Sequence, residues 1–208
     1  MKISYAVTVC NEFVEIQNLI PFLLKHKRHE DEIVVLYDSK NGDSKIEEFL
    51  RAKSINAEFQ WFKDEFDGHF ANWKNKLNSF CSGDWIFQID ADEIPNEILI
   101  ENLHDILERN TTICEVVLVP RVNTVEGLTD EHIQKWGWNV DEKGWVNWPD
   151  MQYRLYQNSP NIKWVNKVHE VLDGFKTISH LPMEEDLALY HPKQIDRQVK
   201  QNEYYDTL

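Results

Sequence analysis

The stretch WIFQIDADEIP, from Trp85 to Pro95, joins an apolar run to a group of acidic residues. The run leads directly into Asp90, Asp92 and Glu93. A short apolar run of this kind is typical of a strand that is buried on both faces. The acidic residues have two interpretations. They cap a helix that begins near Pro95, or they bind a cation.

Strand-like and helix-like segments alternate on both sides of this stretch. Strict alternation predicts a single α/β domain with a mostly parallel sheet and helices on both of its faces. In such sheets ligands bind at the carboxyl ends of the strands, where residues 10–12, Asp38 and residues 90–93 all fall. Three polar groups at one edge favour a binding site. The expected strands are 3–10, 32–38, 57–62, 84–89, 114–121, 151–157 and 162–172; helices are expected at 11–28, 69–81, 95–109, around Ile46–Leu50, and from Pro192 to the end.

Composition restricts the possible partners of the chain. Its 208 residues suit one domain, and 36 acidic against 22 basic residues give a formal net charge of −14. Such a surface repels nucleic acid and anionic membranes, so an anionic ligand would need a bridging cation. The sequence contains no signal peptide and no integral membrane segment, so we expect a cytoplasmic protein. It also lacks the motifs of dinucleotide dehydrogenases, P-loop enzymes, α/β-hydrolases and zincins.

Several segments, in order, resemble glycosyltransferase family 2, whose members have the GT-A fold. GDWIFQIDADE resembles the D-x-D segment of the family, and VTVCNE, EIVVLYDSKNGDS and FANWKNKLNSFCSGDW resemble the segments before it. YRLYQNSPNIKWVNKVHE is similar to the lipopolysaccharide-core glucosyltransferase branch, as is the tail LYHPK…QNEYY. The resemblance covers most of residues 1–93 and 150–205. It implies a Rossmann-like domain that binds a nucleoside-diphosphate sugar, with a UDP-sugar the expected donor.

The resemblance also implies roles for individual residues. Asp38 would meet the uracil or ribose, Asp90 the ribose or donor sugar, and Asp92 would bind Mn²⁺ or Mg²⁺. His169 resembles the histidine that completes the metal shell in some GT-A enzymes, and His191 is an alternative ligand. A neutral imidazole slightly favours manganese. The implied donor-site residues are Val9, Asn11, Glu12, Asp38, Lys74, Asn75, Asp90 and Ala91.

Transfer of a sugar requires a general base for the acceptor hydroxyl. Asp150 resembles the acidic residue that precedes the R-L strand in the family, although it could also be an ordinary loop acid after Pro149. Glu170 is the second choice. Trp138, Trp145 and Trp148 lie in a polar stretch, where they either pack in the core or form a platform for a saccharide acceptor.

The sequence therefore predicts a metal-dependent glycosyltransferase that moves a sugar to a saccharide hydroxyl, with inversion. Residues 1–120 would form the nucleotide-sugar half of the domain, and residues 121–208 the acceptor half and a C-terminal helix. A sugar-nucleotidyltransferase and a catalytically inactive carbohydrate- or nucleotide-binding protein are the alternatives. The donor sugar, the acceptor and the linkage stay open.

Overall fold

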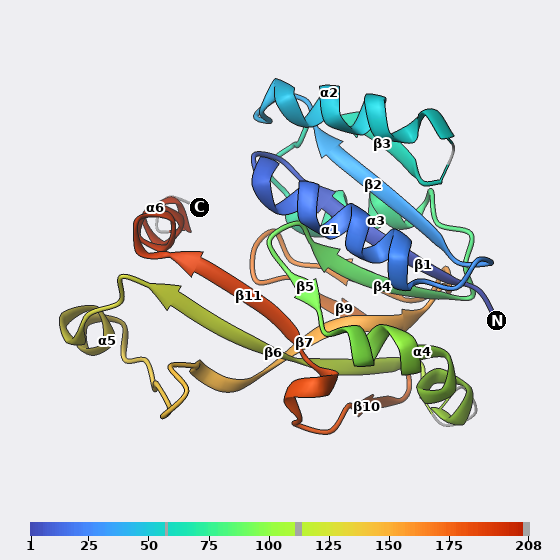
Figure 1. The fold of residues 1–208 in the computed structure, drawn as a ribbon. Helices are drawn as coiled ribbons and strands as arrows, with labels where there is room; N and C mark the ends of the chain where they lie inside the picture. Colours follow the sequence, from blue (N-terminus) through green and yellow to red (C-terminus); the bar gives the residue numbers. More distant parts are fainter. Residues whose placement is uncertain (57, 111–113, 206–208) are drawn as a thin grey trace.

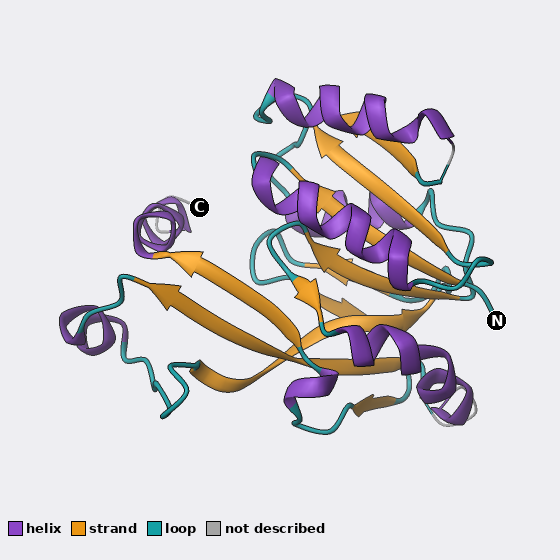
Figure 2. Ribbon diagram, in the orientation of Figure 1, coloured by secondary structure: helices purple, strands orange, loops and turns teal. Residues whose placement is uncertain are grey.

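A computed structural model describes residues 1–56, 58–110 and 114–205. It has a central sheet with the strand order β3-β2-β1-β4-β7-β6-β11-β5, and β10 pairs with the first residues of β6, from Val116 to Leu118 (Figures 1 and 2). The α/β prediction with a mostly parallel sheet is confirmed. No helix within these described ranges has the length and apolar character needed to cross a bilayer.

The first four strands are parallel neighbours, so their carboxyl ends share one edge of the sheet. Asp43 begins the second helix by accepting a hydrogen bond from the backbone N–H of Lys45 at 2.9 Å, as expected for an N-cap. The elements of this half are β1 (Ile3–Val9), α1 (Phe13–His26), β2 (Glu32–Asp38), α2 (Ser44–Lys53), η1 (Ser54–Asn56), β3 (Gln60–Asp64), α3 (Phe70–Asn78) and β4 (Trp85–Asp90).

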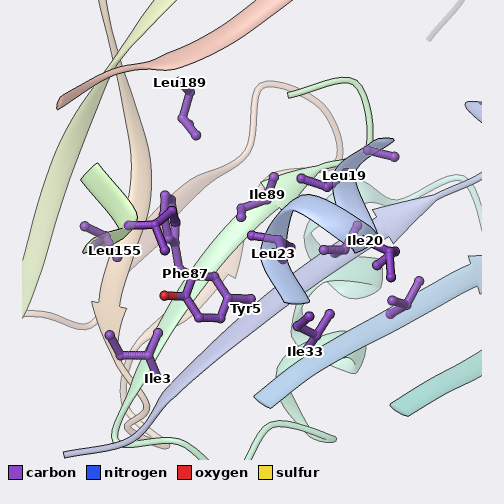
Figure 3. Close-up of a cluster of buried hydrophobic side chains, with 14 of the residues drawn as sticks. Ile3, Tyr5, Leu19, Ile20, Leu23, Ile33, Phe87, Ile89, Leu155 and Leu189 are labelled. Atoms are coloured by element: carbon purple, nitrogen blue, oxygen red, sulfur yellow. The ribbon is translucent and has the colours of Figure 1, made fainter. Parts of the chain in front are cut away.

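Side chains on the two faces of the sheet form separate cores. Ile3, Tyr5 and Val7 of β1 pack on the face covered by α1, where the buried side of α1 presents Leu19 and Leu23 (Figure 3). Ala6, between them in sequence, packs on the other face with α3 and a small two-stranded sheet. This alternation follows from the two-residue period of a strand.

The second half adds antiparallel pairs to the sheet. The long strand β7 lies between β4 and β6 and runs antiparallel to both, whereas β11 runs parallel to β6. The elements are β5 (Ile94–Pro95), α4 (Glu97–Asn110), β6 (Val116–Glu126), α5 (Asp130–Trp136), β7 (Val146–Gln157), β8 (Lys163–Val165), β9 (Val171–Asp173), β10 (Ile178–His180), η2 (Glu185–Leu187), β11 (Leu189–Gln194) and α6 (Ile195–Tyr205).

Several expected elements differ from the structure. The strand predicted at 114–121 extends over Val116–Glu126, the strand predicted at 151–157 already begins at Val146, and three other elements also differ. The strand predicted at 57–62 lies at 60–64; residue 57 is outside the described ranges. The strand predicted at 162–172 is two short strands, because Asn166 and His169 adopt positive φ values of 76° and 52° between them. The C-terminal helix begins at Ile195, three residues later than predicted. The residues before it form strand β11, and Pro192 lies in the part of β11 that is not paired with β5. A proline has no N–H to donate, so it fits a strand only where no such hydrogen bond is needed.

Candidate active site

The polar residues that follow β1, β2 and β4 lie at the shared edge of the parallel strands. Glu12 closes the turn after β1, since its Oε2 accepts hydrogen bonds from the backbone N–H groups of Cys10 and Asn11 at 2.8 and 3.0 Å. Burial and the nearby charge of Asp92 raise the pKa of Glu12. The edge is therefore crowded with carboxylates.

Asp38, at the end of β2, organises the loop that follows it. Its carboxylate accepts hydrogen bonds from the backbone N–H groups of Lys40, Asn41 and Phe66 at 2.9, 3.3 and 3.2 Å. Burial raises the pKa of Asp38, but these hydrogen bonds and one from the Asn41 amide outweigh it, so the pKa is lowered. Asp38 is 3% exposed. Its predicted contact with a nucleotide stays a prediction.

Asp90 lies at the end of β4 between two buried cations. Arg154 Nη2 is 2.7 Å from its Oδ2, and Lys74 Nζ is 3.6 Å from its Oδ1. Thr8 also donates a hydrogen bond to Oδ1 at 3.1 Å. Burial alone would raise the pKa of Asp90, but the charges of Lys74, Arg154 and Arg121 hold it far below the usual range. Asp90 is therefore ionised at neutral pH.

Glu93 is the buried centre of the charged network. Its side chain is 0% exposed and accepts hydrogen bonds from Arg154 and Arg121, with the shortest contacts at 2.6 and 2.9 Å. Its Oε2 also accepts a hydrogen bond from the backbone N–H of Asp90 at 3.1 Å. Glu93 thus fixes the loop that carries Asp90 and Asp92. The helix-cap interpretation is wrong for Glu93, because α4 begins only at Glu97 and Asn96 accepts the hydrogen bond from the backbone N–H of Ile98 there, at 2.9 Å.

Asp92 faces the C-terminal part of the chain. Its Oδ2 lies 3.3 Å from His191 Nε2 on β11 and 3.4 Å from Arg197 Nη2 on α6. Arg197 also contacts Glu12 and Glu15 at 2.7 and 2.9 Å. Burial raises the pKa of Asp92, but His191 and Arg197 lower it more, so the carboxylate stays ionised. Sequence analysis did not identify Arg197.

Asp92 and His191 fit a hard divalent ion as a pair of ligands. An octahedral ion with bonds of about 2.1 Å holds adjacent ligand atoms about 3.0 Å apart, close to the 3.3 Å observed. Within the described ranges, no group of three or more His, Cys, Asp or Glu residues could hold a metal ion. Such ions usually complete their shell with water and substrate phosphates. His169 lies in the turn between β8 and β9, where it is exposed.

Asp150, on β7, is held from two sides. Its Oδ2 accepts hydrogen bonds from Arg121 at 2.7 and 2.9 Å and from Asn123 at 2.9 Å, and Gln152 donates to its Oδ1 at 2.6 Å. Burial raises the pKa of Asp150, but Arg121 and these hydrogen bonds lower it overall. Glu170, the second candidate base, pairs with Lys74 at 2.7 Å.

The other predicted donor-site residues have structural contacts. Asn75 exchanges two hydrogen bonds with the backbone of Trp164, at 2.8 and 2.9 Å, and so joins α3 to β8. Val9 and Ala91 are buried at the strand ends, whereas Asn11 is exposed beside Glu12. None of these contacts tests the predicted donor roles.

Two of the tryptophans lie across the sheet from Asp92. Val122 pairs with Tyr190 and packs with Trp145 and Trp148, while the next pair, Asn123 and His191, must point to the opposite face. The tryptophan rings are 4.9 Å apart and line a cavity of about 400 Å³ that also includes Lys143 and Glu185. Trp138 packs against Trp136 at 4.6 Å. Their predicted contact with an acceptor stays a prediction.

Comparison with solved structures identifies the fold. The chain is similar to TarS 1–349 from S. aureus in complex with UDP-GlcNAc, with a TM-score of 0.66 and 15% identity over 93% of this chain and 59% of TarS 1–349. The complex of the same protein with UDP gives a TM-score of 0.63 at 16% identity, covering 92% and 60% of the two chains. This chain thus spans about three fifths of the TarS fragment. No curated protein matches it by sequence.

The fold is that of GT-A glycosyltransferases. The sequence profile described as glycosyl transferase family 2 matches residues 4–175, which is most of the chain and includes the charged loop from Asp90 to Glu93. The chain belongs to glycosyl transferase family 2.

Proposed function

We propose that this enzyme transfers a sugar from a UDP-sugar to a saccharide hydroxyl, with a divalent metal ion and with inversion at the anomeric carbon. The observation that carries the proposal is the adjacency of Asp92 and His191 at the edge where β1, β2 and β4 end. The TarS complexes with UDP-GlcNAc and UDP, on the same fold, support a uridine nucleotide as the donor group.

The residues would divide the work as follows. Asp92 and His191 would hold a Mn²⁺ or Mg²⁺ ion, and such an ion would supply positive charge to neutralise the diphosphate. Asp150 accepts the proton of the acceptor hydroxyl while the hydroxyl oxygen forms the bond to the anomeric carbon and the bond to the diphosphate breaks. Oδ2 of Asp150 already accepts three hydrogen bonds, so Oδ1, which accepts one from Gln152, is the atom available to the proton.

Calorimetric titration of UDP tests the donor site. Wild-type protein is titrated with UDP in Mn²⁺, in Mg²⁺ and in EDTA, and with GDP in Mn²⁺. We expect UDP to bind in Mn²⁺ but not in EDTA, and Asp92→Asn to lose binding by about 10-fold or more, because the ion loses its carboxylate ligand. Asp105→Asn, an exposed change on α4, is the control and should bind as wild type.

Two results would overturn the proposal. If wild type binds no nucleotide, the proposed donor site is wrong. If nucleotide binding is unchanged both by EDTA and by Asp92→Asn, the proposed metal ion is wrong. Nucleotide binding without transfer to any saccharide, across a screen of UDP-sugars, would instead identify a catalytically inactive nucleotide-binding protein.

A further inference from the structure

We propose that Asn123 is a positioning residue that joins the candidate base and the candidate metal ligand into one hydrogen-bonded unit. This inference rests on the proposed function. Asn123 lies on β6, between Asp150 of β7 and His191 of β11. Its side chain contacts both neighbours, with Nδ2 2.9 Å from Asp150 Oδ2 and Oδ1 2.7 Å from His191 Nδ1.

The direction of both hydrogen bonds follows from the chemistry of the partners. The ionised carboxylate of Asp150 can only accept, so the Asn123 amide must present its NH₂ group there. The Asn123 oxygen must then face His191, and an amide oxygen can only accept. His191 Nδ1 therefore carries a hydrogen and donates it.

The tautomer decides what His191 can offer to Asp92. A hydrogen on Nδ1 leaves Nε2, the atom 3.3 Å from Asp92 Oδ2, as the ring nitrogen that a divalent ion would bind beside Asp92. Without an ion, the carboxylate of Asp92 accepts a hydrogen bond from Nε2, which contributes to its lowered pKa. Metal-binding histidines almost always donate their other ring N–H to a partner that orients the ring. Asn123 provides that partner here, and the same amide holds the base.

The strands explain how one residue reaches both sites. Asn123 and His191 are direct partners in the parallel pairing of β6 with β11, so their side chains share a face. On the other side, the pairing of β6 with β7 shifts between Arg121 and Asn123. This bulge brings Asp150, the register partner of Arg121, within reach of Asn123 as well.

Nitrogen-15 NMR of the imidazoles tests the proposal without metal or nucleotide. Spectra are recorded at about pH 9, where histidines are ordinarily neutral, and His191→Gln assigns the signal among the eight histidines. Wild type should show a hydrogen on His191 Nδ1, whether or not Nε2 also carries one. Asn123→Leu, which removes both hydrogen bonds, should shift His191 toward the Nε2–H form. Asn123→Asp, whose carboxylate still accepts from Nδ1, should keep the wild-type tautomer.

Gln152→Leu is the matched control, because Gln152 donates to Asp150 but its described hydrogen bonds do not include His191. It should leave the tautomer unchanged. In calorimetry, Asn123→Leu should weaken UDP–Mn²⁺ binding about 10- to 100-fold, the usual effect of losing a partner of a metal ligand, whereas Gln152→Leu should not. If Asn123→Leu does not fold, Asn123→Ser, which is too short to reach both partners, replaces it.

A wild-type His191 without a hydrogen on Nδ1, or an Nδ1 protonation or UDP–Mn²⁺ affinity unchanged in Asn123→Leu, would overturn the proposal. A wild-type protein that binds no nucleotide would defeat the proposed function instead. In that case the NMR spectra, which need no nucleotide, would be the only test of whether Asn123 orients His191.

Discussion

At the scale of the residue, Asp150 and Glu170 differ in the groups that surround them. Asp150 is bound by Arg121, Asn123 and Gln152 and keeps a lone pair on Oδ1, whereas Glu170 pairs with the buried Lys74. We expect Asp150→Asn to reduce transfer about 10²- to 10⁴-fold, the usual contribution of a general base, and to leave UDP–Mn²⁺ binding intact. Steady-state transfer and calorimetry measure the two effects.

The pH profile gives a second measure of the same base. Because the pKa of Asp150 is lowered, the carboxylate stays ionised, and so able to accept a proton, until the pH falls below the ordinary aspartate value of about 3.9. Base protonation should therefore not limit the wild-type rate between neutral pH and that value. Glu170→Gln is the comparison: an active Asp150→Asn beside an inactive Glu170→Gln would assign the base to Glu170.

Single residues are predictable when their signal is local. Asp90 and Asp92 could be singled out because they stand at the end of a buried strand, and their roles stay predictions. The partners of Glu93 lie 61 and 28 residues away, at Arg154 and Arg121, so no spacing in the sequence indicates that Glu93 binds them. Asn123 is similar, since its two partners come from different strands.

At the scale of the element, Glu32 joins the amino-terminal ends of neighbouring strands, opposite the site. Its carboxylate accepts hydrogen bonds from Lys2, Ser4 and Ser82, with contacts from 2.6 to 2.8 Å. Burial raises the pKa of Glu32, but these bonds outweigh it and lower the pKa to about 2. A folded-state pKa below the unfolded one stabilises the fold at neutral pH, and that stabilisation is lost as the pH falls.

We therefore expect Glu32→Gln to lower the free energy of unfolding by about 2–3 kcal/mol at neutral pH. Denaturant titration from pH 7 downward measures it. The difference from wild type should shrink as the pH falls from about 4.3 toward about 2, where wild-type Glu32 is also protonated. Glu47→Gln, which breaks pairs with the exposed Arg51 and Lys63, should cost less. A pH-independent loss would contradict this explanation.

The elements of the first half were predictable because strand and helix periods alternate clearly there. The second half was harder, since parallel and antiparallel pairs are mixed there and the strands pair out of sequence order. Strand β11 contains Pro192, and a proline in a sequence ordinarily argues against a strand. This strand forms because β11 pairs with β6, which lies about 70 residues earlier in the sequence. Helix α5 has only seven residues and was not predicted.

At the scale of the whole molecule, α6 joins the end of the chain to its beginning. Arg197 lies among the carboxylates of Glu12, Glu15 and Asp92, in a chain whose net charge is −14. The pKa of Glu12 is already raised by burial and by Asp92. Without the Arg197 guanidinium, less positive charge offsets the repulsion between these carboxylates, and α6 loses its ion pairs to Glu12 and Glu15.

Arg197→Gln should therefore loosen α6 and the first turn of α1 together, although they are far apart in sequence. Hydrogen–deuterium exchange should be faster in peptides from 195–205 and 12–16, and unchanged in β2. Arg51→Gln is the control, because its side chain is 68% exposed and its pair with Glu47 is local to α2. Faster exchange in α6 alone would mean that Arg197 holds the helix without coupling it to α1. Equal exchange in both variants would mean that apolar packing, rather than these ion pairs, closes the second half of the chain onto the first.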